Sequence, residues 1–370
     1  MTVQNLVQGI PQLFRDFLDQ RGLVYDPQTQ VDMLACALGS QFLLFAGPSG
    51  TGKSTAASVL ADFFTPSANQ AILDARPAWT SSEDVVGQYS AYATDYLSGP
   101  VTDDLLRLHN RGGHVPVLTV EEANLSPMEA YIGPVNTTAS SIAFEKMTWP
   151  LHRQQVTTAL TTPQEVRLEG WPRVFGTVNI DSTAEAPAPK VSGRACVVLL
   201  EPPGIDQALG STDAIVPSPI QPPTTPPGAQ LFGDPRQAWS AHLTVGPAGK
   251  FTKALRPLLE VLAASAGQST NLVSPRDVQR CVLFMSWHAP LAEAAKTAGL
   301  LPSFNDAESA ENAVLHYVLP GLSSEQFGRA RPQLLAVATP DGLLARRLKK
   351  LAAGGESLFG VSPDFWASLS

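Results

Sequence analysis

The feature that most constrains this chain is the run GPSGTGKST at residues 47–55. It fits the pattern of a glycine, four residues, a second glycine, a lysine and a serine or threonine, which is typical of phosphate-binding loops. The glycines let the backbone turn so that successive N–H groups point inward at phosphate oxygens. The apolar run QFLLFA before the loop indicates a strand, and STAASVLADFF after it indicates a helix. We therefore predict a strand–loop–helix unit that binds a nucleoside triphosphate.

Within this loop, two side chains have separate predicted tasks. Lys53 would place its charge on the β- and γ-phosphates, and the Ser54 hydroxyl would be a ligand of Mg²⁺. The start of the following helix would add the positive end of its dipole. The residues expected to contact the nucleotide are Gly47, Pro48, Ser49, Gly50, Thr51, Gly52, Lys53, Ser54 and Thr55.

Composition narrows the class of protein further. The chain has 370 residues, of which 44% are hydrophobic, so it can bury a core and is long enough for two or three domains. Its formal net charge of -8 argues against a free-standing nucleic-acid binder, although a local basic groove is compatible with it. The 3 cysteines form no CxxC pair, and no apolar run has the length of a membrane span. The opening residues lack a signal peptide, so we expect a cytoplasmic protein without membrane contact.

Apolar patterns divide the chain into four parts. Residues 1–40 read as a helical segment, and residues 41–205 alternate short apolar strands with helices, which is typical of a parallel sheet covered on both faces. Residues 206–250 are rich in proline and form a predicted linker or loop, and residues 251–370 read as a helical lid. The predicted fold is thus an α/β core with a parallel five-stranded sheet between helices, followed by a helical domain. The expected strands are Phe42–Ala46, Ala71–Ala75, Val115–Val120, Arg173–Asn179 and Ala195–Leu200.

An apolar strand that ends in two carboxylates supplies candidate catalytic residues. In HVPVLTVEEANLS, at residues 114–126, the strand ends at Glu121 and Glu122. The carboxyl ends of parallel strands face the ligand crevice. Glu121 would then join Ser54 around Mg²⁺, and Glu122 would polarise the attacking water.

Several segments together resemble the AAA+ ATPases of the McrB type, to which MoxR-type ATPases are related. The resemblance rests on GLVYDPQTQ, LLFAGPSGTGKS, ARPAWTSSEDVVGQYS, VLTVEEANLSPMEAY and FGTVNIDST, and it covers roughly residues 20–205. It implies an AAA+ P-loop core and lid, a homo-oligomeric ring, commonly a hexamer, and hydrolysis of ATP or GTP with Mg²⁺. It also implies a separate effector, a nuclease in DNA restriction or anti-phage defence, with DNA contacted through the partner or the pore.

The same resemblance gives roles to three further residues. Asn179, in GTVN, would orient the attacking water near the γ-phosphate. Arg194 would be an arginine finger that completes the site of a neighbouring subunit. Arg276, in VSPRDVQR, would reach the γ-phosphate from the lid, with Arg280 one helical turn further on as the alternative.

The sequence departs from relatives at two positions, and two other functions remain open. Relatives usually have Asp where this chain has Glu121, and often have Asp before the finger arginine, where this chain has Gly193. Slow hydrolysis would follow, and a nucleotide-gated scaffold with little turnover is one alternative. A MoxR-like chaperone that remodels a protein client is the other, because it would use the same site.

Three segments have less specific interpretations. Trp79, Tyr89, Tyr92 and Tyr96 could form a stacking platform for a nucleic-acid strand, but half-buried packing is favoured. Residues 136–170 suggest an inserted hairpin, where related motors place loops for substrates or partners. Val24 and Tyr25 are candidate walls of the base pocket, although they do not distinguish ATP from GTP.

Overall fold

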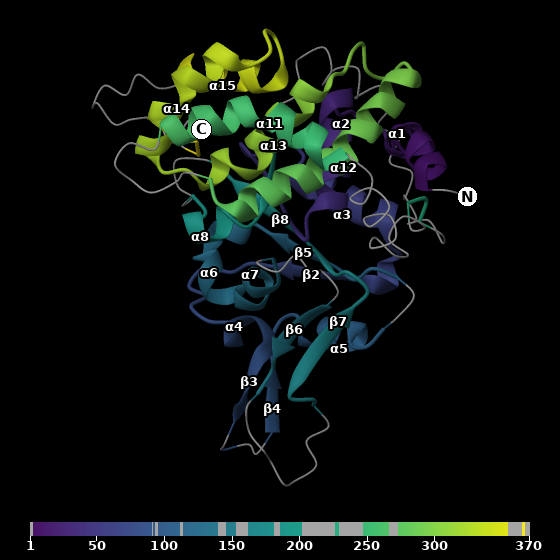
Figure 1. Cartoon of the computed structure of the whole chain (residues 1–370). Helices are drawn as coiled ribbons and strands as arrows, with labels where there is room; N and C mark the ends of the chain where they lie inside the picture. The colour runs from purple at the N-terminus through teal and green to yellow at the C-terminus, as the bar shows by residue number, and fades with distance from the viewer. Residues whose placement is uncertain are drawn as a thin grey trace.

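The computed structural model shows an α/β core beneath a helical region, with two hairpins that extend at the opposite end (Figure 1). It describes residues 3–90, 92, 95–111, 114–139, 146–152, 162–180, 186–201, 226–228, 247–265, 273–353 and 365–366. Most of the predicted proline-rich linker, 206–250, lies outside the described residues. Among the described residues, no helix combines the length and apolar character needed to cross a membrane.

The core is a five-stranded parallel sheet in the order β2-β5-β8-β1-β9. Every residue of β1 and β9 is buried, and only the last residue of β8 is not. Such continuous burial requires apolar runs, and these runs are what revealed the strands in the sequence. All five predicted strands are present, with ends within two residues of the expected ones. The strands are β1 (Phe42–Gly47), β2 (Gln70–Asp74), β5 (Val117–Glu121), β8 (Arg173–Asn179) and β9 (Cys196–Leu199).

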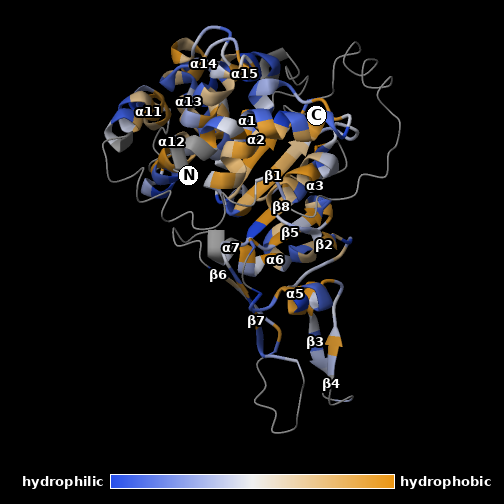
Figure 2. Cartoon of the chain, turned by 90° about the vertical axis from the view of Figure 1, so that its right-hand side faces the viewer, coloured by the Kyte–Doolittle hydropathy of each residue, from blue (hydrophilic) through white to orange (hydrophobic). Residues whose placement is uncertain are grey.

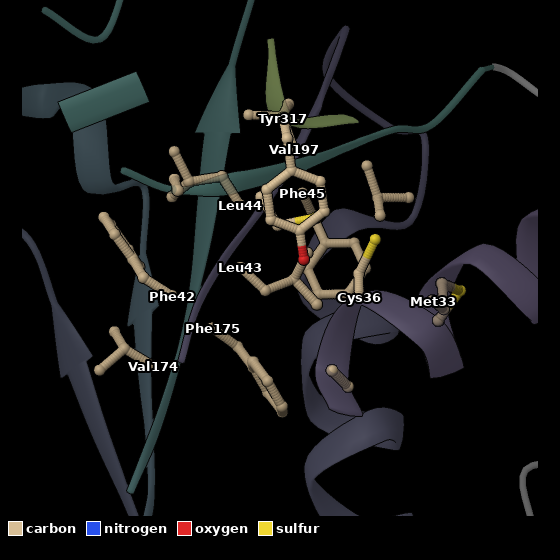
Figure 3. Packing of buried hydrophobic residues seen from close by; sticks show 14 of the residues in the cluster. Met33, Cys36, Phe42, Leu43, Leu44, Phe45, Val174, Phe175, Val197 and Tyr317 are labelled. Atoms are coloured by element: carbon tan, nitrogen blue, oxygen red, sulfur yellow. The ribbon is translucent and has the colours of Figure 1, made fainter. Parts of the chain in front are cut away.

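Helices cover the sheet and enclose its apolar side chains. Phe45 of β1 and Phe175 of β8 lie on the side of Cys36 and the N-terminal helix α2 (Pro27–Gly39), whereas Phe42 points to the other face of the sheet with Val174 (Figure 3). The strands carry the apolar colouring in the hydropathy view (Figure 2). The 3 cysteines are buried free thiols, as the scattered spacing predicts. The helices and turns of the core are α3 (Lys53–Phe64), η1 (Ser67–Asn69), α4 (Glu83–Val86), α5 (Thr102–Leu108), η2 (Ala123–Leu125), α6 (Met128–Tyr131), α7 (Gly133–Ala139) and α8 (Pro189–Ser192).

Two antiparallel hairpins are inserted between the strands of the main sheet. One pairs β3 (Gly87–Ser90) with β4 (Asp95–Ser98), and the other pairs β6 (Lys146–Pro150) with β7 (Glu165–Glu169). Both lie at the end of the molecule away from the C-terminal helices (Figures 1 and 2). The second confirms the hairpin predicted within residues 136–170.

The aromatic residues of the first insertion are mostly packed rather than exposed. Trp79 is buried against Tyr131, with ring centroids 5.2 Å apart. Tyr96 is buried and Tyr89, opposite it in the hairpin, is half-buried. Tyr92 alone among the four predicted aromatic residues is fully exposed. The packing interpretation therefore holds for three of the four.

The C-terminal region is helical, as predicted, and three of its helices begin at capping boxes. In each box the side chain of the residue before the helix accepts a hydrogen bond from the backbone N–H of the third helical residue, and the side-chain oxygen of that third residue accepts one from the backbone N–H of the residue before the helix. These pairs are Ser274 with Asp277, Asn305 with Glu308, and Ser323 with Gln326. The helices and turn of this region are α11 (Pro247–Ala264), α12 (Pro275–Thr297), α13 (Asp306–Tyr317), η4 (Leu319–Gly321), α14 (Ser324–Val337) and α15 (Leu343–Ala353).

The N-terminal helices α1 (Val3–Asp19) and α2 (Pro27–Gly39) pack against α12 as well as against the core. A buried polar cluster joins them to the lid. Asp32 of α2 lies 3.0 Å from Nε2 of His288 and 3.3 Å from Nε2 of His316, and it accepts a hydrogen bond of 3.1 Å from Asn312. The burial of Asp32 alone would raise its pKa, but the two imidazoles hold the pKa well below its ordinary value. The lid is thus tied to the N-terminal helices through a charged centre.

Candidate functional site: a phosphate-binding loop facing an acidic strand end

The loop of residues 47–52 joins β1 to α3 in a conformation that needs its glycines. Gly50 and Gly52 have φ values of 81° and 80°, which belong to the left-handed region that favours glycine. A Cβ atom on Gly47 would lie 2.3 Å from the carbonyl oxygen of Leu200, so a side chain cannot fit there. The motif glycines are therefore required by the backbone path itself.

Lys53 is the first residue of α3 and its side chain turns back into the loop. Its Nζ donates a hydrogen bond of 2.7 Å to the carbonyl oxygen of Pro48, and the residue is only 6% exposed. Thr51 Oγ1 donates to the same oxygen at 3.0 Å. The ammonium group is thus held inside the turn at the N-terminus of a helix, where both the charge and the helix dipole favour an anion.

The two residues predicted to hold Mg²⁺ are in direct contact. Ser54 Oγ, in the first turn of α3, donates a hydrogen bond of 2.5 Å to Oε2 of Glu121, at the end of β5. The longer side chain of Glu121, compared with the Asp that the resemblance leads one to expect, therefore still reaches the serine. A hydroxyl and a carboxylate oxygen side by side suit Mg²⁺, which prefers hard oxygen ligands and takes its remaining ligands from phosphate and water. The donor set fits the metal.

Thr177, on the neighbouring strand β8, connects the two glutamates and was missed by the sequence reasoning. Its hydroxyl accepts a hydrogen bond of 2.8 Å from the backbone N–H of Glu122 and donates one of 2.9 Å to Oε2 of Glu121. Glu122 itself has φ 50° and ψ 43°, a left-handed conformation that few residues other than glycine adopt. The hydroxyl of Thr177 therefore helps to fix the turn in which Glu122 is exposed.

Asn124 makes a second connection between the same two strands. Its Nδ2 donates to the carbonyl oxygen of Asn179 at 2.8 Å, and its Oδ1 accepts from the N–H of Asn179 at 3.1 Å. The end of β8, where the predicted sensor Asn179 lies, is thereby fixed beside the acidic turn. The available sequence signal was a pair of polar residues, Thr177 and Asn124, at the ends of adjacent apolar strands.

The predicted arginines lie near the end of the sheet at which the parallel strands begin, whereas the phosphate-binding loop lies where β1 ends. Arg194 precedes β9, whose first residue pairs with Leu43 near the start of β1. Arg280 donates a hydrogen bond of 2.9 Å to the carbonyl oxygen of Gly193, which brings the head of α12 to this same end. Arg276, one turn earlier, is exposed. The structure therefore does not bring these arginines to the loop of their own chain, and their roles remain predictions.

A pocket of about 500 Å³ opens beside the loop, and neither Glu121 nor Glu122 is among the residues that line it. Its walls include Val24 and Tyr25, the residues proposed from sequence for the base pocket. The Tyr25 hydroxyl donates a hydrogen bond of 3.2 Å to the carbonyl oxygen of Gly52, and burial raises its pKa to about 12. The opposite wall comes from α15 of the lid, which the sequence gave no reason to expect.

Comparison with known protein families finds no match, and comparison with curated proteins finds no relative. Solved structures do match. One is a protein from Cytophaga hutchinsonii ATCC 33406, provisionally named an ATPase, with a TM-score of 0.55 and 13% identity over 91% of this chain and 97% of that one. At such low identity the likeness shows the fold alone. The fold is thus an α/β core with a five-stranded parallel sheet, a phosphate-binding loop after β1 and a helical C-terminal region, as the sequence predicts.

Proposed function

We propose that this protein binds and hydrolyses ATP or GTP with Mg²⁺. The observation that carries the proposal is the contact between the first turn of α3 and the acidic strand end, made by Ser54 and Glu121 at 2.5 Å. This contact places the phosphate-binding loop next to the carboxylates at the end of β5, which are suited to bind the metal and to activate water. Mg²⁺ would supply charge neutralisation at the transferred phosphoryl group.

The residues of the chain divide the remaining work. Lys53 and the loop N–H groups bind the phosphates, while Ser54 and Glu121 hold the metal. Glu122, exposed at the turn after β5, accepts a proton from the attacking water, and Asn179 orients that water. Thr177 and Asn124 keep these groups in register across the two strands.

The finer proposal is a McrB-like motor subunit that forms a ring, with a hexamer favoured, and drives or licenses a separate effector, such as a nuclease, in DNA restriction or anti-phage defence. The position of Arg194 at the end of the sheet opposite the loop supports a contribution to the neighbouring subunit's site, because an arginine there cannot serve its own. The two hairpins would be available to a partner, or to DNA within the pore. The wider alternatives, a client-remodelling chaperone and a scaffold with little turnover, would use the same loop.

The test measures binding and steady-state hydrolysis of ATP and GTP by the purified chain, with and without the product of the neighbouring gene and DNA. Glu122→Gln is expected to keep binding and to lower the hydrolysis rate by about 10²-fold or more, since it keeps the shape and removes the base. Lys53→Ala is expected to lose binding. Unchanged hydrolysis by Glu122→Gln would reject the catalytic assignment, and stimulation by a protein client instead of DNA would favour the chaperone.

A further inference from the structure

The pocket beside the loop is formed by four segments that are far apart in the sequence. They are residues 22–29, residues 50–55 of the loop and α3, Leu200 and Glu201 after β9, and residues 343–350 of α15. A volume of about 500 Å³ lies within the range of small-ligand and cofactor sites. Because one wall is the loop itself, a nucleotide bound by the loop would extend into this pocket.

The acidic groups on the pocket walls are already engaged. Asp26 caps α2 and accepts hydrogen bonds from the N–H groups of Gln28 at 3.1 Å and Thr29 at 3.2 Å. Glu201 pairs with two cations of α15: Arg347 contacts its Oε1, and Nζ of Lys350 lies 2.7 Å from its Oε2.

Arg347 also fixes α15 against the core. It is 9% exposed, and its guanidinium donates a second hydrogen bond, of 3.0 Å, to the carbonyl oxygen of Leu199 at the end of β9. This anchor holds one face of α15 toward the pocket. The cation next to it, Arg346, lines the pocket and is exposed.

Among the three cationic residues that line the pocket, Arg346 is the one without an acidic partner on the described walls. Within the described part of the chain, its guanidinium makes no ion pair, whereas Arg347 and Lys350 share Glu201. Arginine presents a planar set of donors that matches phosphate oxygens. An exposed guanidinium facing a pocket that begins at a phosphate-binding loop is therefore suited to the polyphosphate of the same nucleotide.

We propose that α15 is the part of the lid that contacts the chain's own nucleotide, with Arg346 binding its phosphate chain and Arg347 positioning the helix through Glu201. This proposal rests on the proposed nucleotide-binding function. It assigns the contact to a residue about 70 positions after Arg276, the lid arginine expected from the resemblance.

The test is binding of fluorescent ATP and GTP analogues to the full chain with Mg²⁺, without any measurement of turnover. Arg346→Gln is expected to weaken binding about tenfold, the scale of one charge-assisted hydrogen bond. Lys349→Gln is the matched control, because Lys349 lies on the same helix, is 61% exposed in its side chain and does not line the pocket. It is expected to bind within about twofold of the wild type. Raising the salt concentration should weaken the wild type more than Arg346→Gln.

The outcomes separate this proposal from the function on which it rests. If the wild type binds neither analogue, the nucleotide-binding function itself is wrong. If the wild type binds and Lys53→Ala does not, but Arg346→Gln binds like the wild type, only the role of α15 is overturned. A loss of equal size in Lys349→Gln would also overturn it, because the effect would then come from the general charge of the helix.

Discussion

The side chain of Asn124 and the backbone of Asn179 exchange two hydrogen bonds, of 2.8 Å and 3.1 Å, across the ends of β5 and β8. One amide thus satisfies both the carbonyl and the N–H of a residue 55 positions away. Since Asn179 is the predicted sensor of the γ-phosphate, its position depends on a side chain that has no predicted contact with nucleotide. Asn124 is therefore a positioning residue in the proposed site.

Replacing Asn124 tests this dependence. Asn124→Ala removes both hydrogen bonds, so the maximal hydrolysis rate should fall about tenfold while the dissociation constant of the triphosphate stays within about twofold. Asn124→Asp keeps the acceptor for the N–H of Asn179 but loses the donor, and an intermediate rate is expected. Steady-state kinetics and nucleotide titration measure the two effects. A weaker affinity with an unchanged rate would contradict the positioning role.

The hydroxyl of Thr177 should influence the metal requirement. Thr177→Val keeps the shape but leaves the N–H of Glu122 without the hydroxyl that accepts from it, and leaves Glu121 with Ser54 but without the Thr177 donor. The Mg²⁺ concentration needed for half-maximal hydrolysis should therefore rise several-fold. Thr177→Ser keeps the hydroxyl and should behave like the wild type. The measurement is a Mg²⁺ titration of the hydrolysis rate. Identical titration curves for Thr177→Val and the wild type would show that the hydroxyl does not support the metal site.

Arg280 and Arg276 should differ in their effect on stability, although they lie one helical turn apart. Arg280 donates to Gly193 and lies 5.2 Å above the ring of Tyr317, so Arg280→Ala should lower the free energy of unfolding by about 1–2 kcal/mol. Arg276 is exposed, and its replacement should change stability by less than about 0.5 kcal/mol. Urea denaturation measures both. Equal losses would show that the head of α12 is not docked through Arg280.

The buried cluster around Asp32 predicts a pH dependence of stability. Burial alone would lower the pKa of His316, but Asp32 and the carbonyl oxygen of Val197 outweigh it, so the pKa is raised above its usual value of about 6.5. A raised pKa in the folded protein gives stability that is complete below pH 6.5 and is lost as the pH rises through the folded value.

The measurement is the urea midpoint at pH 6 and at pH 8.5. The midpoint of the wild type should fall over this range, and that of His316→Asn should fall less, because the variant lacks the titrating group. The variant should also be less stable at pH 6, where it leaves the Asp32 carboxylate with one imidazole fewer. A parallel decline in both proteins would exclude His316 as the source.

Much of the fold follows from local patterns in the sequence. The run FLLFAG of β1 is buried at every position, and a parallel strand with helices on both sides requires such continuous apolar character. The loop glycines were predicted because the turn needs backbone angles that other residues avoid, and Gly50 and Gly52 adopt them. The sequence also predicts that Ser54 and Glu121 lie close together, because both are expected to be ligands of the same Mg²⁺ ion.

The remaining relationships depend on which elements become neighbours, and no local pattern specifies that. Thr177 meets the two glutamates only because β8 lies next to β5 in the sheet. The head of α12 lies beside Gly193, and α15 beside the loop, only because of how the lid docks on β9 and α2. By itself, the sequence determined the strands, the phosphate-binding loop and the kinds of side chain expected to bind phosphate and metal, since each of these rests on a few consecutive residues. Only the tertiary structure decided which polar side chains support the site and which lid helix faces the pocket, because those contacts join residues separated by tens to hundreds of positions.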